Sequence, residues 1–116
     1  MGSFIKAGKT SDFEDGTMKK LLVQEHEILL ARVGDKYYAA DNRCPHLKGN
    51  LSAGRLEGTL ITCPLQGSQF DLRDGKVIRW MKEPVLSPAA RKTRYPPKPL
   101  KTYNVKVEGD IVLVEI

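Results

Sequence analysis

Positions 43–71 read RCPHLKGNLSAGRLEGTLITCPLQGSQFD, and this segment contains both cysteines of the 116-residue chain and one of its two histidines. Cys44 and Cys63 are each followed directly by proline and, four or five residues after the cysteine, by glycine, which is typical of a loop. Sixteen residues (47–62) separate His46 from Cys63. Thiolate and imidazole are donors that suit soft and borderline metals. The sequence therefore predicts two loops, at the tips of neighbouring hairpins, that face one another and hold one inorganic centre.

The same residues admit other interpretations when they are taken alone. A buried cysteine is often only a small apolar residue, and Cys44 and Cys63 also allow a disulfide. With His46 they offer three donors to zinc, with a fourth position open. Two cysteines are too few for a disulfide scaffold, so a reducing, cytoplasmic location is expected.

The rest of the chain shows short β-type runs separated by turns, and helical periodicity is hard to find. Asp74-Gly75 and Gly109-Asp110 are strong hairpin signals. The sequence predicts an all-β fold, a small antiparallel sandwich or barrel in a single domain over residues 1–116, with loops at about 43–51 and 62–70. The expected strands are 18–23, 27–33, 36–40, 59–62, 70–72, 76–78, 103–107 and 111–116.

Charge is distributed unevenly along the chain, whose formal net charge is +5. Between Lys76 and Lys106 nine Lys/Arg stand against one acid (net +8), while the remaining residues hold ten against thirteen (net −3). A proline-rich basic loop is expected at about 81–99. It is either a docking surface for an acidic partner or a solvated loop. Nucleic acid is not the expected partner, because few aromatic residues accompany the charges, and no apolar run reaches the roughly 20 residues that cross a membrane.

The paired motif resembles the Rieske ferredoxin family, which binds a two-iron two-sulfur cluster through Cys-x-His, a spacer of about 16 residues and Cys-x-x-His. The resemblance implies that two cysteines hold one iron and two histidines hold the other. It covers nearly the whole chain apart from 81–99, which has the character of an insertion. The matching residues are Cys44, His46, Gly49 and Leu51 in the first half and Cys63, Pro64, Gly67, Phe70 and Asp71 in the second.

One departure falls on a ligand position, because Gln66 stands where the family has its second histidine. A carboxamide is a neutral, weakly basic oxygen donor that suits hard cations better than iron bridged by sulfide. Gln66 therefore either ligates weakly, holds a water that ligates, or leaves one iron exposed and the cluster labile. The only other histidine, His26, lies in an expected turn far from the motif in sequence, and we interpret it as a surface residue.

The neighbouring residues refine the expected redox type. High-potential Rieske proteins carry a further cysteine in each loop, and here those positions hold Lys48 and Leu65. Ser68 is kept, but Phe70 replaces a tyrosine, so fewer hydroxyl groups reach the cluster sulfurs and a lower potential is implied. Residues expected to shield the cluster or to form an apolar collar around it are Pro45, Leu47, Pro64 and Leu65.

The resemblance implies a low-potential Rieske-type ferredoxin that carries single electrons from a reductase to an oxygenase-like enzyme. No acid–base pair or nucleophilic triad is visible, so the chain is expected to be a carrier and not an enzyme. The alternative is an interaction module of the same fold, or a reductase small subunit, that binds no cluster. Three intact ligand positions out of four weigh against that alternative.

Overall fold

The computed structural model describes residues 3–45, 49–65, 67–79 and 98–116. Helical structure in this part of the chain is confined to two single turns, η1 (Thr10–Asp12) and η2 (Leu51–Ala53), and no helix there is long enough to cross a membrane. The strands are β1 (Phe4–Lys9), β2 (Thr17–Val23), β3 (His26–Val33), β4 (Lys36–Asp41), β5 (Arg55–Glu57), β6 (Leu60–Thr62), β7 (Gln69–Asp71), β8 (Val77–Arg79), β9 (Thr102–Tyr103), β10 (Val105–Glu108) and β11 (Ile111–Glu115).

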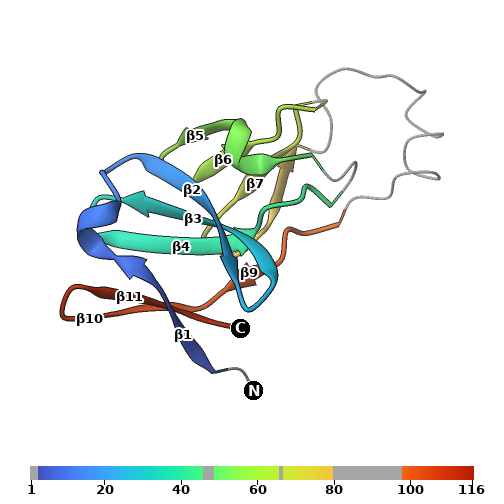
Figure 1. Ribbon diagram of the computed structural model, residues 1–116. Helices are drawn as coiled ribbons and strands as arrows, with labels where there is room; N and C mark the ends of the chain where they lie inside the picture. The colour runs from blue at the N-terminus through green and yellow to red at the C-terminus, as the bar shows by residue number, and fades with distance from the viewer. Residues whose placement is uncertain (1–2, 46–48, 66, 80–97) are drawn as a thin grey trace, which may run out of the picture.

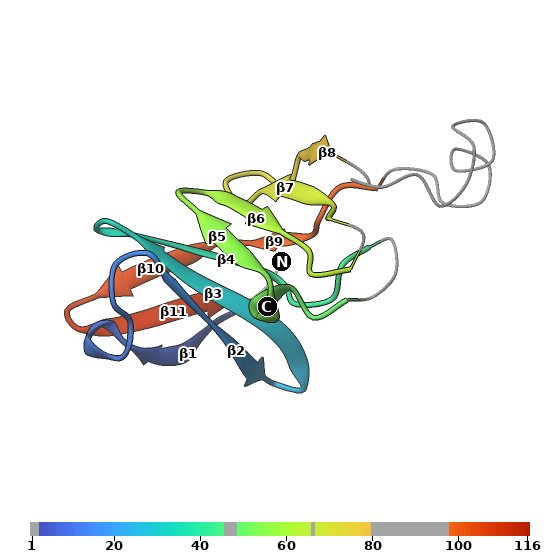
Figure 2. The same cartoon turned by 90° about the horizontal axis from the view of Figure 1, so that it is seen from above.

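The described strands form three antiparallel sheets that lie one above another in Figure 1. The central sheet has the order β2-β3-β4-β9, the upper sheet is the meander β5-β6-β7-β8, and the lower sheet has the order β1-β11-β10. The upper sheet carries one cysteine loop, and the central sheet leads into the other through β4. Figures 1 and 2 show both loops at the same end of the molecule.

Strand β3 explains how three layers hold together. Four consecutive residues of this strand, Ile28 to Ala31, are fully buried. Because side chains alternate across a strand, Leu29 and Ala31 pack toward the upper sheet while Ile28 and Leu30 pack toward the lower one. A strand covered on both faces requires an uninterrupted apolar run, which is what the sequence has at this position. The upper core contains Ile61, Phe70 and Leu72, and the lower core contains Phe13, Val112 and Val114.

The prediction of an all-β antiparallel fold is confirmed, and each expected strand overlaps one that is observed. β1 and β5 were not among the expected strands, and β9 was not separated from β10, because one strand was expected over 103–107. Their short or mixed sequences carry little β signal, and they are strands because a partner pairs with them, as β11 does with β1 and β4 does with β9. Most of the predicted proline-rich loop, residues 80–97, lies outside the described residues.

Candidate metal centre

Two loops of similar construction carry the cysteines. We name residues 43–50 loop 1 and residues 62–69 loop 2. Arg43 and Asn50 close loop 1 as an antiparallel bridge, and the Cys44 N–H donates to the Gly49 carbonyl at 2.9 Å. Cys44 is therefore the first residue of a hairpin tip, held by its own backbone.

Loop 2 repeats this arrangement. Thr62 and Gln69 are paired at the ends of β6 and β7, and the Cys63 N–H donates to the Ser68 carbonyl at 2.7 Å. In both loops the cysteine N–H bonds the carbonyl of the fifth residue after it. The two cysteines thus occupy equivalent places in two hairpin tips that are distant in sequence.

The two cysteines meet between the loops. Cys44 and Cys63 are 0% and 1% exposed, belong to the upper core, and carry thiols that are not joined as a disulfide. A hydrogen bond from the Cys44 thiol lowers the pKa of Cys63 to about 7, against the opposing effect of burial and with help from the backbone N–H of Leu65. The Cys44 thiol and the Leu65 N–H therefore favour the thiolate of Cys63, which is the form of cysteine that binds metals.

Gly49 permits this close approach of the loops. A Cβ built on Gly49 would lie 2.8 Å from the Cys63 sulfur and 3.2 Å from the Leu65 side chain. Only a glycine leaves room at this point, so Gly49 provides a cradle for the Cys63 sulfur.

The remaining predicted site residues are placed as follows. Ser68 is fully buried, Pro45 is half-buried, and Pro64 and Leu65 are exposed, with Leu65 at 47%. An apolar surface thus adjoins loop 2 beside the buried thiols. His46, Leu47 and Gln66 lie outside the described residues. His26 is an exposed residue at the start of β3.

The structure adds two supporting residues that the sequence analysis did not identify. Asn42 is fully buried at the base of loop 1 and donates from Nδ2 to Glu27 Oε2 at 2.9 Å and to Asn50 Oδ1 at 2.6 Å. Arg79 on β8 donates to the Gly67 carbonyl of loop 2 from Nε at 3.1 Å and from a terminal nitrogen at 3.0 Å. A polar residue directly after the predicted strand 36–40 and its turn-side residue Asp41 was the only available signal for Asn42. Nothing local marked Arg79.

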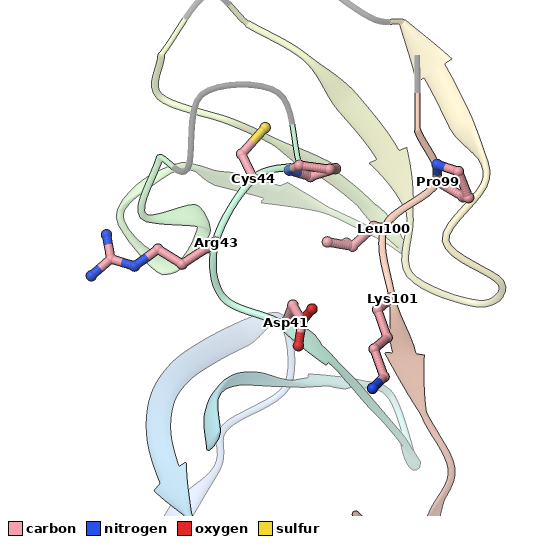
Figure 3. Close-up of a pocket in the computed structure, with 7 residues that line it drawn as sticks. Asp41, Arg43, Cys44, Pro99, Leu100 and Lys101 are labelled. Carbon is pink, nitrogen blue, oxygen red and sulfur yellow. The ribbon is translucent and has the colours of Figure 1, made fainter. Parts of the chain in front are cut away.

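A pocket of about 200 Å³ lies beside loop 1, between its first residues and the chain that enters β9 (Figure 3). In Figure 3 the Asp41 and Leu100 side chains border this space, while the Cys44 sulfur and the Arg43 guanidinium point away from it. Asp41 accepts a hydrogen bond of 2.5 Å from the Tyr103 hydroxyl, and burial together with this carboxylate raises the pKa of Tyr103. The pocket is thus separate from the meeting point of the thiols. Its lining is Asp41, Arg43, Cys44, Pro45, Pro99, Leu100 and Lys101.

Comparison with protein families gives one match, the Rieske [2Fe-2S] domain, over residues 3–109. The chain belongs to this family. Membership of this family implies a two-iron two-sulfur cluster.

Curated relatives of this Rieske chain are ferredoxin components of dioxygenase systems. It is 32% identical over 113 residues to the ferredoxin component of the naphthalene 1,2-dioxygenase system of Pseudomonas putida, covering 97% of this chain and 95% of the relative. It is 31% identical over 114 residues to the biphenyl 2,3-dioxygenase ferredoxin component of Rhodococcus jostii, covering 98% and 94%. These relatives are electron-transfer components and not catalytic subunits, so the prediction of a ferredoxin-type electron carrier is confirmed.

Solved structures agree with this assignment. The ferredoxin of carbazole 1,9a-dioxygenase from Nocardioides aromaticivorans is 25% identical and superposes with a TM-score of 0.79 over 97% of this chain and 96% of that one. A chain in the complex of reduced oxygenase and oxidized ferredoxin of carbazole 1,9a-dioxygenase is 29% identical, with a TM-score of 0.75 over 97% and 92%.

The donor set fits one half of such a cluster fully and the other half in part. The buried, contacting thiols and the Gly49 cradle suit an iron held by two thiolates. For the second iron the motif offers one imidazole, from His46, and the carboxamide of Gln66 in place of the other. The difference between this chain and the family pattern is therefore confined to one donor of loop 2.

Proposed function

We propose that this chain is a low-potential Rieske-type ferredoxin of the cytoplasm that carries single electrons from a reductase to an oxygenase of the aromatic-ring dioxygenase class. The observation that carries this proposal is the meeting of the Cys44 and Cys63 thiols from two equivalent hairpin tips. The oxygenase partner is supported by the relatives named above and by the ferredoxin–oxygenase complex that the chain resembles. Two buried cysteines that remain thiols suit a reducing compartment.

Four residues would hold the cluster: Cys44 and Cys63 on one iron, His46 and Gln66 on the other. When bound, the cluster supplies a one-electron redox couple. The protein's own contribution is to keep both sulfurs out of water, since each is at most 1% exposed, while the exposed Pro64 and Leu65 border the site. A small apolar border suits the brief contacts of redox partners.

Two further features support a low potential. Phe70 is fully buried beside the cysteines in the upper core and has no hydroxyl to offer a cluster sulfur. High-potential Rieske proteins carry one further cysteine in each loop. In this chain those two positions are Lys48 and Leu65. Fewer hydrogen bonds to sulfur stabilise the reduced, more negative cluster less.

Gln66 makes the cluster of this chain more labile than that of a ferredoxin with two histidines. An oxygen donor of low basicity replaces an imidazole, so the iron on that side exchanges more readily with water.

The test compares the chain purified without oxygen with its Gln66→His variant. A red-brown absorption is expected in both, and the variant is expected to give, after reduction, a Rieske-type electron paramagnetic resonance signal, because its second iron has two imidazole ligands again. The variant is expected to hold more iron per chain and to lose it several-fold more slowly, because imidazole binds iron more strongly than a carboxamide does. Gln24→His, an exposed turn residue, makes the same substitution away from the loops and is expected to change neither property.

The outcomes separate the carrier from its alternative. A colourless, iron-free chain whose Gln66→His variant is equally colourless would contradict the carrier and favour an interaction module without a cluster. A coloured wild-type chain that the histidine does not change would show that Gln66 is not at the fourth ligand position.

A further inference from the structure

Asn42 is a fully buried polar residue at the point where β4 passes into loop 1. Its side chain is 0% exposed, so each of its polar atoms requires a partner within the protein. Both Nδ2 hydrogens are used, on Glu27 Oε2 at 2.9 Å and Asn50 Oδ1 at 2.6 Å. Its Oδ1 accepts from the Ser52 N–H at 2.9 Å.

The backbone of Asn42 is satisfied as well. Its N–H donates to the Glu27 carbonyl at 3.2 Å, and its carbonyl accepts from the Leu51 N–H at 2.8 Å. One residue therefore ties three segments together: strand β3, the closing end of loop 1, and the turn η2. Loop 1 lies between these segments, with Cys44 two positions after Asn42.

Glu27 is the charged end of this arrangement. Besides the Asn42 amide, its carboxylate contacts the Arg43 guanidinium, with Nε at 2.8 Å. The Asn42 hydrogen bond and the Arg43 charge lower the pKa of Glu27, so the carboxylate stays ionised and remains a strong acceptor. Two consecutive residues at the start of loop 1 are thus held by a single carboxylate of the central sheet.

We propose that Asn42 is the positioning residue of loop 1: its carboxamide, held by Glu27, fixes the loop so that Cys44 is presented to Cys63. The proposal rests on the proposed function for its purpose, which is to pre-organise a cluster ligand. The proposed effect of Asn42 on loop 1 does not depend on a bound cluster, because it concerns how readily loop 1 opens in the metal-free chain.

The test uses Asn42→Asp, which keeps the size of the side chain and removes both amide donors. A carboxylate at this position would face the carboxylate of Glu27 and the oxygen of Asn50, so loop 1 should open more often. In the metal-free full chain, alkylation of Cys44 under native conditions is expected to accelerate by about tenfold, the scale on which losing a buried hydrogen bond shifts an opening equilibrium. Labelling of each cysteine is resolved by mass spectrometry, and Cys44 should accelerate more than Cys63.

A matched control exists elsewhere in the molecule. Asn104 also donates from Nδ2 to a glutamate, Glu115 Oε1 at 2.8 Å, but it lies at the exposed end of the lower sheet. Asn104→Asp makes the same chemical change to an Asn–Glu pair away from the loops. It is expected to leave the labelling rate of both cysteines unchanged.

A second variant distinguishes positioning from general destabilisation. In Asn42→Asp/Glu27→Gln the donor and acceptor are exchanged, so the amide introduced at position 27 can again bond the side chain at position 42. Partial recovery of the Cys44 labelling rate is expected, whereas Glu27→Gln alone, which loses the contact with Arg43, should accelerate labelling slightly. In the iron-loaded chain, Asn42→Asp should also shift the electron paramagnetic resonance g-values, which Asn104→Asp should not.

Two results would overturn the proposal. One is an equal acceleration of Cys44 and Cys63 in Asn42→Asp, which would show loss of global stability alone. The other is a Cys44 rate equal to that of the wild type. Because the labelling is done without metal, a chain that binds no cluster would contradict the proposed function and still leave this measurement decisive.

Discussion

Loops 1 and 2 are closed by equivalent backbone hydrogen bonds but are supported in different ways. Loop 1 is held from within, by the buried carboxamide of Asn42 and the carboxylate of Glu27 on the central sheet. Loop 2 is held from its outer side, by the half-buried Arg79 on the Gly67 carbonyl, and by a 3.2 Å hydrogen bond from Gln69 to Thr62 at its base. Buried networks resist opening more than contacts near solvent. From this difference we predict that the start of loop 1 opens less readily than loop 2, which is also the loop where Gln66 replaces the family's histidine.

The largest effect is expected from replacing either cysteine, and the two variants test whether each loop supplies a thiolate ligand to the iron. Cys44→Ser and Cys63→Ser should each abolish bound iron, because a hydroxyl does not replace a thiolate on an iron–sulfur centre. In the metal-free chain each should also lower the free energy of unfolding by about 1–3 kcal/mol, since a hydroxyl enters an apolar core. Iron analysis and denaturant titration measure these effects. An iron content equal to that of the wild type in either variant would show that the cysteine of that loop is not a ligand.

The next effect concerns the contact between the loops. Gly49→Ala would place a Cβ 2.8 Å from the Cys63 sulfur, and the backbone of Cys63 is held by its hydrogen bond to Ser68. Overpacking of this kind is expected to lower the free energy of unfolding by about 1–3 kcal/mol and to reduce iron content. Gly8→Ala is the control, with its nearest contacts at 3.3 Å and far from the loops. Equal stability losses in the two variants would mean that the loops are not tightly apposed.

A smaller effect is expected at the outer support of loop 2. Arg79→Leu removes both hydrogen bonds to the Gly67 carbonyl and should lower stability by about 1 kcal/mol, the net value of such contacts near solvent. Cys63 should then be alkylated faster, with Cys44 changed less, which is the mirror image of Asn42→Asp. Arg55→Leu, an exposed arginine of the same sheet, is the control. A faster reaction at Cys44 than at Cys63 would contradict the prediction that loop 1 opens less readily than loop 2.

The smallest effect is a pH dependence in the hairpin that follows loop 2. The Arg73 side chain, through its hydrogen bonds to Asp71, lowers the pKa of that carboxyl to about 2 from an ordinary 3.8. A lowered pKa stabilises the folded chain above pH 4, and the gain is lost as the pH falls from about 4 to about 2. Because Arg73 is mostly exposed, solvent screens the pair and its contribution to stability is small. Arg73→Gln should flatten the stability curve in this window, and an unchanged acid titration would show that the pair contributes nothing.

Much of the fold was accessible from local sequence. The apolar run at Ile28–Ala31 predicted part of a strand, and Asp74-Gly75 and Gly109-Asp110 predicted turns, because each signal is carried by neighbouring residues. β5 could not be predicted from the sequence, because only one of its three residues is apolar and because the strand depends on pairing with β6. The same distinction applies to the site: the motif named the cysteines, whereas Asn42 and Arg79 carry no motif and act through partners distant in the chain.

The amino-acid order alone settled which donors this chain possesses: two thiols, one imidazole in the first motif, and a carboxamide where a second imidazole is usual. It also settled that the chain is built of short strands joined by turns. Whether Cys44 and Cys63 touch was settled by the packing of the upper sheet on the central one, with Gly49 leaving room for the Cys63 sulfur. The physical reason is that ligand identity and strand period are local properties of a chain. The meeting of two hairpin tips depends on burying side chains that the sequence holds far apart.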